Sequence, residues 1–203
     1  IPLRLVGSEM CIRDRLEHAG VGLMSMLARL VQRPTALGLR VEPMRRRHVP
    51  SVLEIERVSY PRPWTENVFN NELEMARRGE RTYVVARQGR ELVGYAGLMY
   101  AVDEAHVTNI AVAPSLHRQG VATRLLAELA WSAIDYGSTA LTLEVRVSNT
   151  PAQRLYERFG FEAAGVRPRY YENVEDAIVM WCHQIRTDEY RASLRTLCPE
   201  VGR

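Results

Sequence analysis

Lysine is absent from the sequence, and arginine supplies all 27 basic residues of the 203-residue chain. Without lysine, the chain cannot anchor pyridoxal phosphate or form a Schiff base with a carbonyl substrate. It also cannot complete a GxxxxGK[ST] loop, whose lysine contacts nucleotide phosphates. The absence therefore excludes lysine-dependent Schiff-base chemistry and P-loop nucleotide binding.

Cysteine and long apolar runs are also scarce. Cys11, Cys182 and Cys198 are odd in number and widely spaced, which favours free thiols in a reducing compartment, and we expect a cytoplasmic protein. Cys182, His183 and Cys198 lack a second ligand pair for zinc, so we expect no metal. No apolar run reaches the roughly 18 residues of a membrane span, so we expect no membrane partner.

The net charge of +3 is concentrated near the N-terminus. Residues 1–50 contain nine arginines and four acidic residues, whereas residues 51–203 contain 18 arginines and 20 acidic residues. The body of the chain is thus close to neutral. A protein that coats nucleic acid needs a strongly basic surface, so we expect no direct nucleic-acid partner.

Three segments differ in their sequence pattern. Residues 1–38 are irregular, and residues 6–15 resemble a translated adaptor sequence, so we expect an N-terminal extension that is non-native or disordered in part. Residues 39–186 alternate regularly between strand and helix patterns and form the expected folded domain. Residues 187–203 are expected to be a C-terminal tail.

The folded segment mixes strand and helix patterns in an order typical of one α/β domain. A strand–helix–strand unit over residues 106–147 predicts two parallel strands within an otherwise antiparallel, mixed sheet. Between the last two strands we expect a polar loop that carries two tyrosines. The predicted strands are 39–42, 82–87, 92–100, 106–113, 139–147, 161–166 and 177–185, and the predicted helices are 50–59, 66–78, 123–136 and 150–160.

A strand, a short polar loop and a helix meet at Gly120. The strand stops at Pro114, and Gly120 stands where the next helix begins. Such a loop presents backbone N–H groups at the positive end of the helix dipole, which suits a pyrophosphate. Glycine lets the backbone approach the phosphates closely, and the small Ala122 keeps the approach open. By itself, the same pattern also fits an ordinary strand–helix turn.

Glu144 and Tyr156 are candidates for acid–base chemistry. Glu144 lies in a strong strand, on the face opposite the apolar Leu141, Leu143 and Val145. Tyr156 lies in the middle of the following helix. A carboxylate and a phenol brought together could move protons in both directions. From the residues alone, an exposed glutamate and a packed tyrosine remain open alternatives.

These blocks are similar to segments of the Gcn5-related N-acetyltransferase (GNAT) family. Its acyl-CoA loop has the pattern [Gln/Arg]-x-x-Gly-x-[Gly/Ala]; Gly120 and Ala122 match it, and His117 stands where Gln or Arg is usual. Residues 143–149, 155–161, the tyrosine pair and the Asp-Ala-Ile-x-Met strand resemble its RimI-type ribosomal-protein alanine N-acetyltransferases. The resemblance covers about residues 39–186. It implies a mostly antiparallel sheet flanked by helices, with a parallel strand pair that forms the acetyl-CoA cleft.

The resemblance also implies an activity and its residues. Glu144 would be the general base for an incoming α-amine, which attacks acetyl-CoA directly, and Tyr156 would give a proton to the departing CoA thiolate. The three cysteines lie outside these blocks, which argues against a thiol nucleophile. The implied acetyl-CoA-binding residues are Ile110, Ala111, Val112, Arg118, Gln119, Gly120, Val121, Ala122, Thr123 and Asn149.

The resemblance also implies that aromatic residues recognise the acceptor peptide, on two sides of the groove that binds it. Trp64 lies between the first two helices, and Tyr170 and Tyr171 lie before the last strand. These rings could clamp the extended N-terminal peptide of a ribosomal protein, or they could simply pack in the core. Arg167 and Arg169 could attract acidic acceptor residues, although solvated arginines are the simpler interpretation.

The implied substrate is the N-terminal alanine of the eighteenth small-subunit ribosomal protein. One alternative keeps the chemistry and changes the acceptor to other N-termini, lysines or small amines. Another is a non-catalytic CoA-binding partner, against which the Glu144 and Tyr156 pair argues. A third is a component of a tRNA-modification assembly, with which RimI-type proteins can be encoded or fused.

Overall fold

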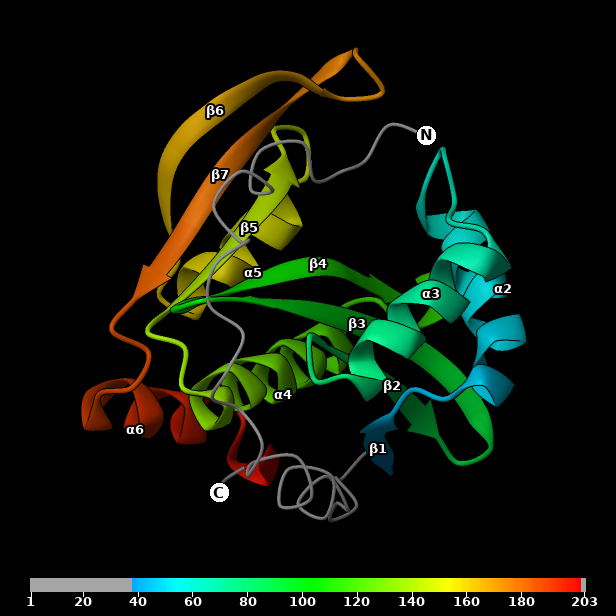
Figure 1. Ribbon diagram of the computed structural model, residues 1–203, viewed down its shortest axis with the longest axis horizontal. Helices are drawn as coiled ribbons and strands as arrows, with labels where there is room; N and C mark the ends of the chain where they lie inside the picture. Colours follow the sequence, from blue (N-terminus) through cyan, green and yellow to red (C-terminus); the bar gives the residue numbers. More distant parts are fainter. Residues whose placement is uncertain (1–37, 202–203) are drawn as a thin grey trace.

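The computed structural model describes residues 38–201, so the expectation for the N-terminal extension falls almost wholly outside the described residues. These residues form a seven-stranded sheet in the order β1-β2-β3-β4-β5-β7-β6, with helices on both faces (Figure 1). None of the described helices is long and apolar enough to cross a membrane. The elements are β1 (Leu39–Pro43), η2 (Arg46–His48), α2 (Val49–Ser59), α3 (Glu66–Arg77), β2 (Arg81–Gln88), β3 (Glu91–Ala101), β4 (Glu104–Val112), η3 (Pro114–Leu116), α4 (Val121–Tyr136), β5 (Ala140–Arg146), α5 (Thr150–Arg158), β6 (Glu162–Tyr171), β7 (Glu175–His183), α6 (Asp188–Leu197) and η4 (Pro199–Val201).

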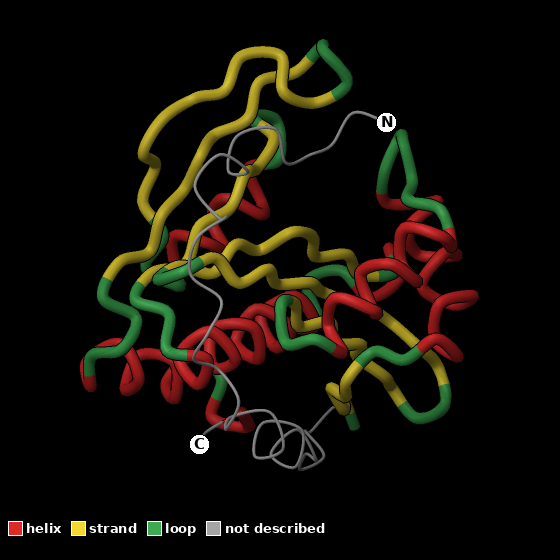
Figure 2. The backbone as a smooth tube through the Cα atoms, in the orientation of Figure 1, coloured by secondary structure: helices red, strands yellow, loops and turns green. Residues whose placement is uncertain are grey.

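The sheet is mixed and mostly antiparallel, as the sequence predicts. β4 and β5 pair in parallel, and every other neighbouring pair of strands is antiparallel. The α4 crossover between the two parallel strands makes this connection possible. The alternation of strands and helices along the tube in Figure 2 follows the predicted order, and most predicted boundaries lie within two residues of the observed ones.

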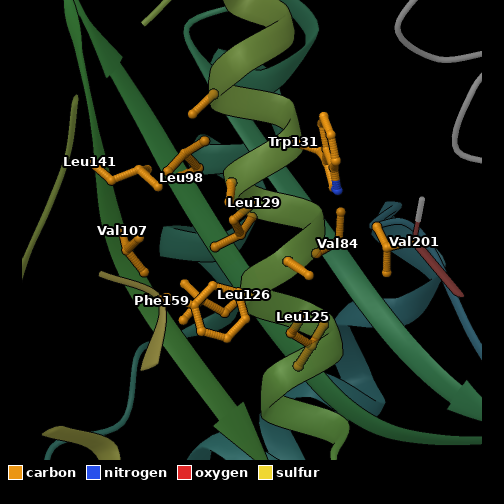
Figure 3. Close-up of a cluster of buried hydrophobic side chains, with 14 of the residues drawn as sticks. Val84, Leu98, Val107, Leu125, Leu126, Leu129, Trp131, Leu141, Phe159 and Val201 are labelled. Atoms are coloured by element: carbon orange, nitrogen blue, oxygen red, sulfur yellow. The ribbon is translucent and has the colours of Figure 1, made fainter. Parts of the chain in front are cut away.

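Helix α4 packs its apolar stripe on one face of the sheet. Leu125, Leu126 and Leu129 are fully buried and lie among strand side chains, with Phe159 beside them (Figure 3). Each such leucine contributes roughly 1.5–3 kcal/mol by leaving water. We call this cluster the α4-side core; its sheet members include Val84, Leu98, Val107 and Leu141.

Helices α2 and α3 cover the opposite face. Their buried residues Val52, Ile55 and Phe69 contact Tyr83 and Tyr95 of the sheet. This second cluster is the α2/α3-side core. In β2, Val84 and Ala86 belong to the α4-side core, and Tyr83 and Val85 belong to the α2/α3-side core, because successive side chains of a strand point to opposite faces. An irregularity in the β2–β3 pairing shifts this alternation within β3, so Val93 faces one core and Tyr95 the other.

A bulge in β4 reverses which side chains face α4. Gly97 of β3 pairs with Asn109, while the next residue, Leu98, pairs with Val107, so Thr108 is an extra residue in β4. Before the bulge, Ala105 and Val107 belong to the α4-side core, and after it Ile110 and Val112 do. The bulge therefore turns Ile110 and Val112 toward α4.

The C-terminal segment is folded where the sequence pattern predicts a tail. Helix α6 and η4 place Leu194, Cys198 and Val201 in the α4-side core. Figure 3 shows Val201 close to Trp131 of α4 and Val84 of the sheet. The polar residues of α6 mask this anchoring in the sequence, since only one side chain within α6 itself is buried.

The tyrosine pair is also placed differently from the prediction. Tyr170 and Tyr171 end strand β6, and the turn between β6 and β7 is confined to residues 172–174. The strand pairing is irregular between Arg167 and Tyr171. Pro168 cannot donate to a strand ladder, which explains why the sequence pattern favours a loop here.

Because Thr108 of the bulge and Tyr83 lie close to Gly97, a methyl group added at position 97 should destabilise the fold. In Gly97→Ala the new Cβ would overlap Cε1 of Tyr83 and lie 2.5 Å from Oγ1 of Thr108. We expect the free energy of unfolding to fall by about 1–3 kcal/mol, as overpacking costs in cores, measured by denaturant unfolding. Gly165→Ala is the control, since its Cβ meets no described atom within 4 Å. Equal stability of both variants would contradict the tight contact.

Candidate active site

Strands β4 and β5 part after only three residue pairs. The pairing runs from Glu104 and Ala140 to His106 and Thr142, and among residues 38–201 no strand pairs with this edge of β4 beyond that point. The N–H of Ala113 donates to the carbonyl of Val93, so alternate residues turn their backbone toward β3. Ile110 and Val112 therefore present their backbone groups to the opening between β4 and β5 (Figure 1).

A cavity of about 910 Å³ lies on the α4 side of this opening. It is bounded by the end of β4, the loop before α4, the first turns of α4 and α5, and the C-terminal segment. Ala111 does not line it, because the bulge turns its side chain into the α2/α3-side core. The predicted residues that line it are Ile110, Val112, Arg118, Gln119, Gly120, Val121, Ala122, Thr123, Asn149 and Tyr156.

The start of α4 has the features of a phosphate site. Gly120 adopts a φ of 82°, and a Cβ added there meets no described atom within 4 Å. The backbone N–H groups of the first helical turn have no partner within the helix, and they lie at the positive end of its dipole. The loop thus leaves an open, electropositive cradle for a pyrophosphate beside the cavity.

Two side chains engage the backbone of β4 at the opening. Nε2 of His117 lies 3.0 Å from the carbonyl oxygen of Val112, and because a carbonyl only accepts, Nε2 carries the hydrogen. The Tyr60 hydroxyl donates to the carbonyl of Ile110 at 3.0 Å. His117, which departs from the family pattern, therefore braces the end of β4.

Glu144 lies on the sheet face opposite α4, as its alternation with Leu143 and Val145 predicts. Its side chain is 8% exposed and meets two nitrogen donors: Nε2 of His106 at 3.0 Å and Nη2 of Arg167 at 3.2 Å. Burial raises the pKa of Glu144, but the hydrogen bond from His106 and the charges of His106 and Arg167 outweigh it, so the pKa is lowered. The carboxylate is therefore ionised at neutral pH.

Tyr156 lies on the cavity side of the sheet. Helix α5 packs it against the α4-side core near Phe161. Burial raises the pKa of its hydroxyl to about 12, so the phenol is protonated and can donate. Asn149 is the N-cap of this helix, and its side-chain oxygen accepts from the N–H of Ala152 at 3.2 Å.

The sequence model of the Acetyltransferase (GNAT) family matches residues 49–161. The chain belongs to this family.

Close relatives agree with this assignment. A Bacillus subtilis protein named "Putative [ribosomal protein bS18]-alanine N-acetyltransferase" is 38% identical over 142 residues, which cover 70% of this chain and 93% of that protein. The Escherichia coli K12 "[Ribosomal protein bS18]-alanine N-acetyltransferase" is 36% identical over 137 residues, which cover 65% and 88%. The crystal structure of the ribosomal-protein-S18-alanine N-acetyltransferase from Escherichia coli has a TM-score of 0.65 and 31% identity, over 72% of this chain and 94% of that one.

The fold is therefore the GNAT fold, and the protein is an acetyl-CoA-dependent N-acetyltransferase. The cavity and the cradle at Gly120 fit the cosubstrate, because the cavity adjoins a helix N-terminus whose backbone N–H groups suit a pyrophosphate.

Two of the predicted acceptor residues lie next to Glu144. The Tyr171 hydroxyl donates to the backbone carbonyl of Glu144 at 3.0 Å, and Arg146 lies over its ring at 4.1 Å. Tyr170 contacts Tyr171 edge-on at 5.1 Å and has Arg167 5.6 Å from its ring centre. These contacts attach the end of β6 to the strand that carries the carboxylate.

Trp64 has a structural role that is visible in the fold. Its ring contacts Phe69 at 5.4 Å, and its backbone N–H donates to Oε1 of Glu56 at 2.8 Å. Glu56 is fully buried and also accepts from the Tyr95 hydroxyl, so it fixes the segment between α2 and α3. Glu56 is not among the residues predicted from the sequence. A carboxylate on the apolar stripe of residues 52–59 could have indicated a buried, hydrogen-bonded group there.

The C-terminal segment forms part of the wall of the cavity on the α4 side of the sheet. Leu197, Cys198, Pro199 and Glu200 line it, and Glu200 accepts from the buried Arg124 of α4 at 3.1 Å. Burial raises the pKa of the Cys198 thiol, so this cysteine is protonated and a poor nucleophile. Residues 188–201 lie beyond the part of the chain that the family's sequence model matches.

If the loop at Gly120 binds the CoA phosphates, a negative charge at this position should weaken CoA binding. Gly120→Glu would place bulk and negative charge against the phosphates, so we expect the Kd for CoA to rise at least tenfold by calorimetry. Gly89→Glu is the matched control, because Gly89 also has a positive φ and no described atom near its Cβ but lies in the β2–β3 turn. Unchanged CoA affinity in Gly120→Glu would remove the loop from the binding site.

Proposed function

We propose that this GNAT enzyme acetylates the N-terminal α-amine of ribosomal protein bS18 at its alanine. The observation that carries the proposal is the arrangement of an ionised carboxylate and a protonated phenol on opposite faces of the sheet, at the opening between β4 and β5. The names of the Bacillus subtilis and Escherichia coli relatives support the acceptor.

Glu144 acts as the general base. A free α-amine has a pKa of about 8, so most of it is protonated at neutral pH and cannot attack. The carboxylate takes a proton from the α-ammonium, directly or through a water, and the neutral amine then attacks the acetyl carbonyl. No acyl-enzyme forms, which agrees with the protonated state of the buried cysteines.

Tyr156 acts as the general acid. Its hydroxyl is on the cavity side, where the CoA thiolate departs, and its raised pKa keeps a proton available. Ile110 and Val112 pair through their backbone with the pantetheine arm like an added strand, and Asn149 donates through its amide nitrogen. The backbone of residues 118–123 holds the pyrophosphate.

The acceptor peptide enters on the Glu144 side. Tyr170 and Tyr171 form one wall, and Trp64, held by Glu56, forms the other. We place the catalytic domain at residues 39–186, with residues 187–201 as an added element on it. A ribosomal acceptor implies a cytoplasmic enzyme.

The test is intact-mass spectrometry of synthetic N-terminal hexapeptides incubated with acetyl-CoA and the full chain. We expect acetylation of a peptide with the bS18 alanine start and none of peptides that begin with Met or Ser, or of a blocked peptide that carries Lys. Acetylation of several free N-termini would keep the chemistry and overturn the bS18 specificity. Modification of the blocked Lys peptide alone would overturn the α-amine assignment.

If Tyr156 is the general acid, removal of its hydroxyl should lower kcat and leave acetyl-CoA binding nearly unchanged. In Tyr156→Phe the proton donor is removed while the ring remains, so we expect kcat to fall about 100-fold and the Kd for acetyl-CoA to change less than threefold. Tyr136→Phe is the control, since Tyr136 is exposed at the end of α4, where it stacks on Tyr100. A kcat within twofold of the unmodified enzyme would exclude Tyr156 as the acid.

A further inference from the structure

Both carboxylate oxygens of Glu144 already have a partner. Oε2 faces Nε2 of His106 at 3.0 Å, and Oε1 faces Nη2 of Arg167 at 3.2 Å. A carboxylate oxygen can accept more than one hydrogen bond, but the incoming ammonium must approach a carboxylate that already contacts a guanidinium. Two cations beside one carboxylate repel each other, so the approach of the acceptor favours displacement of one partner.

The two partners differ in how firmly they are held. His106 is 13% exposed and lies at the last position where β4 is paired on both sides, with Met99 of β3 and Thr142 of β5. Its backbone is thus fixed by two neighbouring strands. The short imidazole side chain adds only two rotatable bonds, so the position of Nε2 is well defined.

Arg167 is held less firmly. Its side chain is 40% exposed, and it stands on β6, the outermost strand, where regular pairing with β7 ends. Its guanidinium is cationic, as is the α-ammonium of an acceptor, so one can replace the other at Oε1 without a change in local charge. When the exposed Arg167 leaves Glu144, water hydrates its guanidinium again, so the free-energy cost of breaking this contact is small.

The other charged residues near Glu144 and its two partners form ion pairs with different residues. Arg146, two residues beyond Glu144 on β5, contacts Glu172 and Glu175. Glu72 of α3 contacts Arg81 of β2 and accepts from Tyr83, which meets Thr108 two residues beyond His106. The charged neighbours that contact the Glu144 carboxylate are thus His106 and Arg167.

We propose that His106 is a positioning residue that holds Oε2 of Glu144, and that Arg167 gives up Oε1 to the α-ammonium of the acceptor. The proposal rests on the base role of Glu144. When the ammonium N–H bond breaks, its proton goes to Oε1 directly or through a water. His106 keeps the hydrogen on Nε2 throughout, because a carboxylate oxygen can only accept from it.

Two substitutions separate this role from a general structural one. His106→Leu removes the donor, whereas His106→Gln places an amide N–H near the position of Nε2. His183→Leu is the control, since His183 is an exposed residue of β7 that stacks on Trp181. The Glu144 side-chain carbonyl carbon is followed by ¹³C NMR titration of the full chain, with its signal assigned by its loss in Glu144→Gln.

In His106→Leu we expect the Glu144 pKa to rise, because burial is then opposed by Arg167 alone. We also expect kcat for the alanine-start peptide to fall about tenfold with the acetyl-CoA Kd unchanged. His106→Gln should restore kcat to within threefold of the unmodified enzyme, and His183→Leu should change neither quantity. Addition of the alanine-start peptide without acetyl-CoA, so that its free α-ammonium binds but does not react, should weaken the Arg167 contact, seen as a shifted Arg167 Nε resonance.

An unchanged Glu144 titration in His106→Leu would overturn the proposal, as would a Gln variant as slow as the Leu variant. An Arg167 resonance that ignores the bound acceptor would overturn the exchange step. If the unmodified enzyme acetylates none of the peptides, the proposed function fails, while the titration still reports whether His106 holds Glu144.

Discussion

Two parallel strands that pair over three residues and then part leave backbone donors and acceptors without a strand partner, deep inside a domain. Such groups are costly unless they are satisfied. In this chain the hydroxyl of Tyr60 and the imidazole of His117 meet the carbonyls of β4, and the N–H groups remain turned toward the cavity. In the proposed binding mode, the pantetheine arm of acetyl-CoA pairs with these groups like an added strand. The opening between β4 and β5 is thus the constraint on which the cavity, the positions of acid and base, and the entry of the acceptor all depend.

The sheet keeps the two proton-transfer groups apart. Glu144 is ionised on one face beside His106 and Arg167, and Tyr156 is protonated on the other beside apolar residues. A buried carboxylate and a buried phenol in direct contact would share a proton and lose their separate roles. Placing them on opposite faces lets the environment of each push its pKa in the direction that its role needs. In the proposed mechanism, Glu144 reaches the amine on one side of the opening and Tyr156 reaches the CoA sulfur on the other.

The parts of the site that depend on local sequence were predictable. Gly120 at the start of α4 and the face of Glu144 each follow from a few neighbouring residues, and the structure has them as predicted. The side-chain direction of Ala111 was not predictable, because it depends on the Thr108 bulge, which is set by pairing with β3. His106 lies 38 residues before Glu144 in the sequence, and only the parallel pairing of their strands brings them together. The same holds for α6, whose anchoring depends on partners in α4 that its own polar pattern does not reveal.

The C-terminal segment of residues 188–201 has its own consequence. It helps to build the wall of the cavity, and Glu200 links it to the helix whose first turn faces the phosphates. Cosubstrate affinity and local folding of the C-terminus are therefore thermodynamically linked, so each stabilises the other by the same free energy. A change that loosens η4 would therefore be expected to weaken binding in the cavity, although η4 lies away from Glu144 on the opposite face of the sheet.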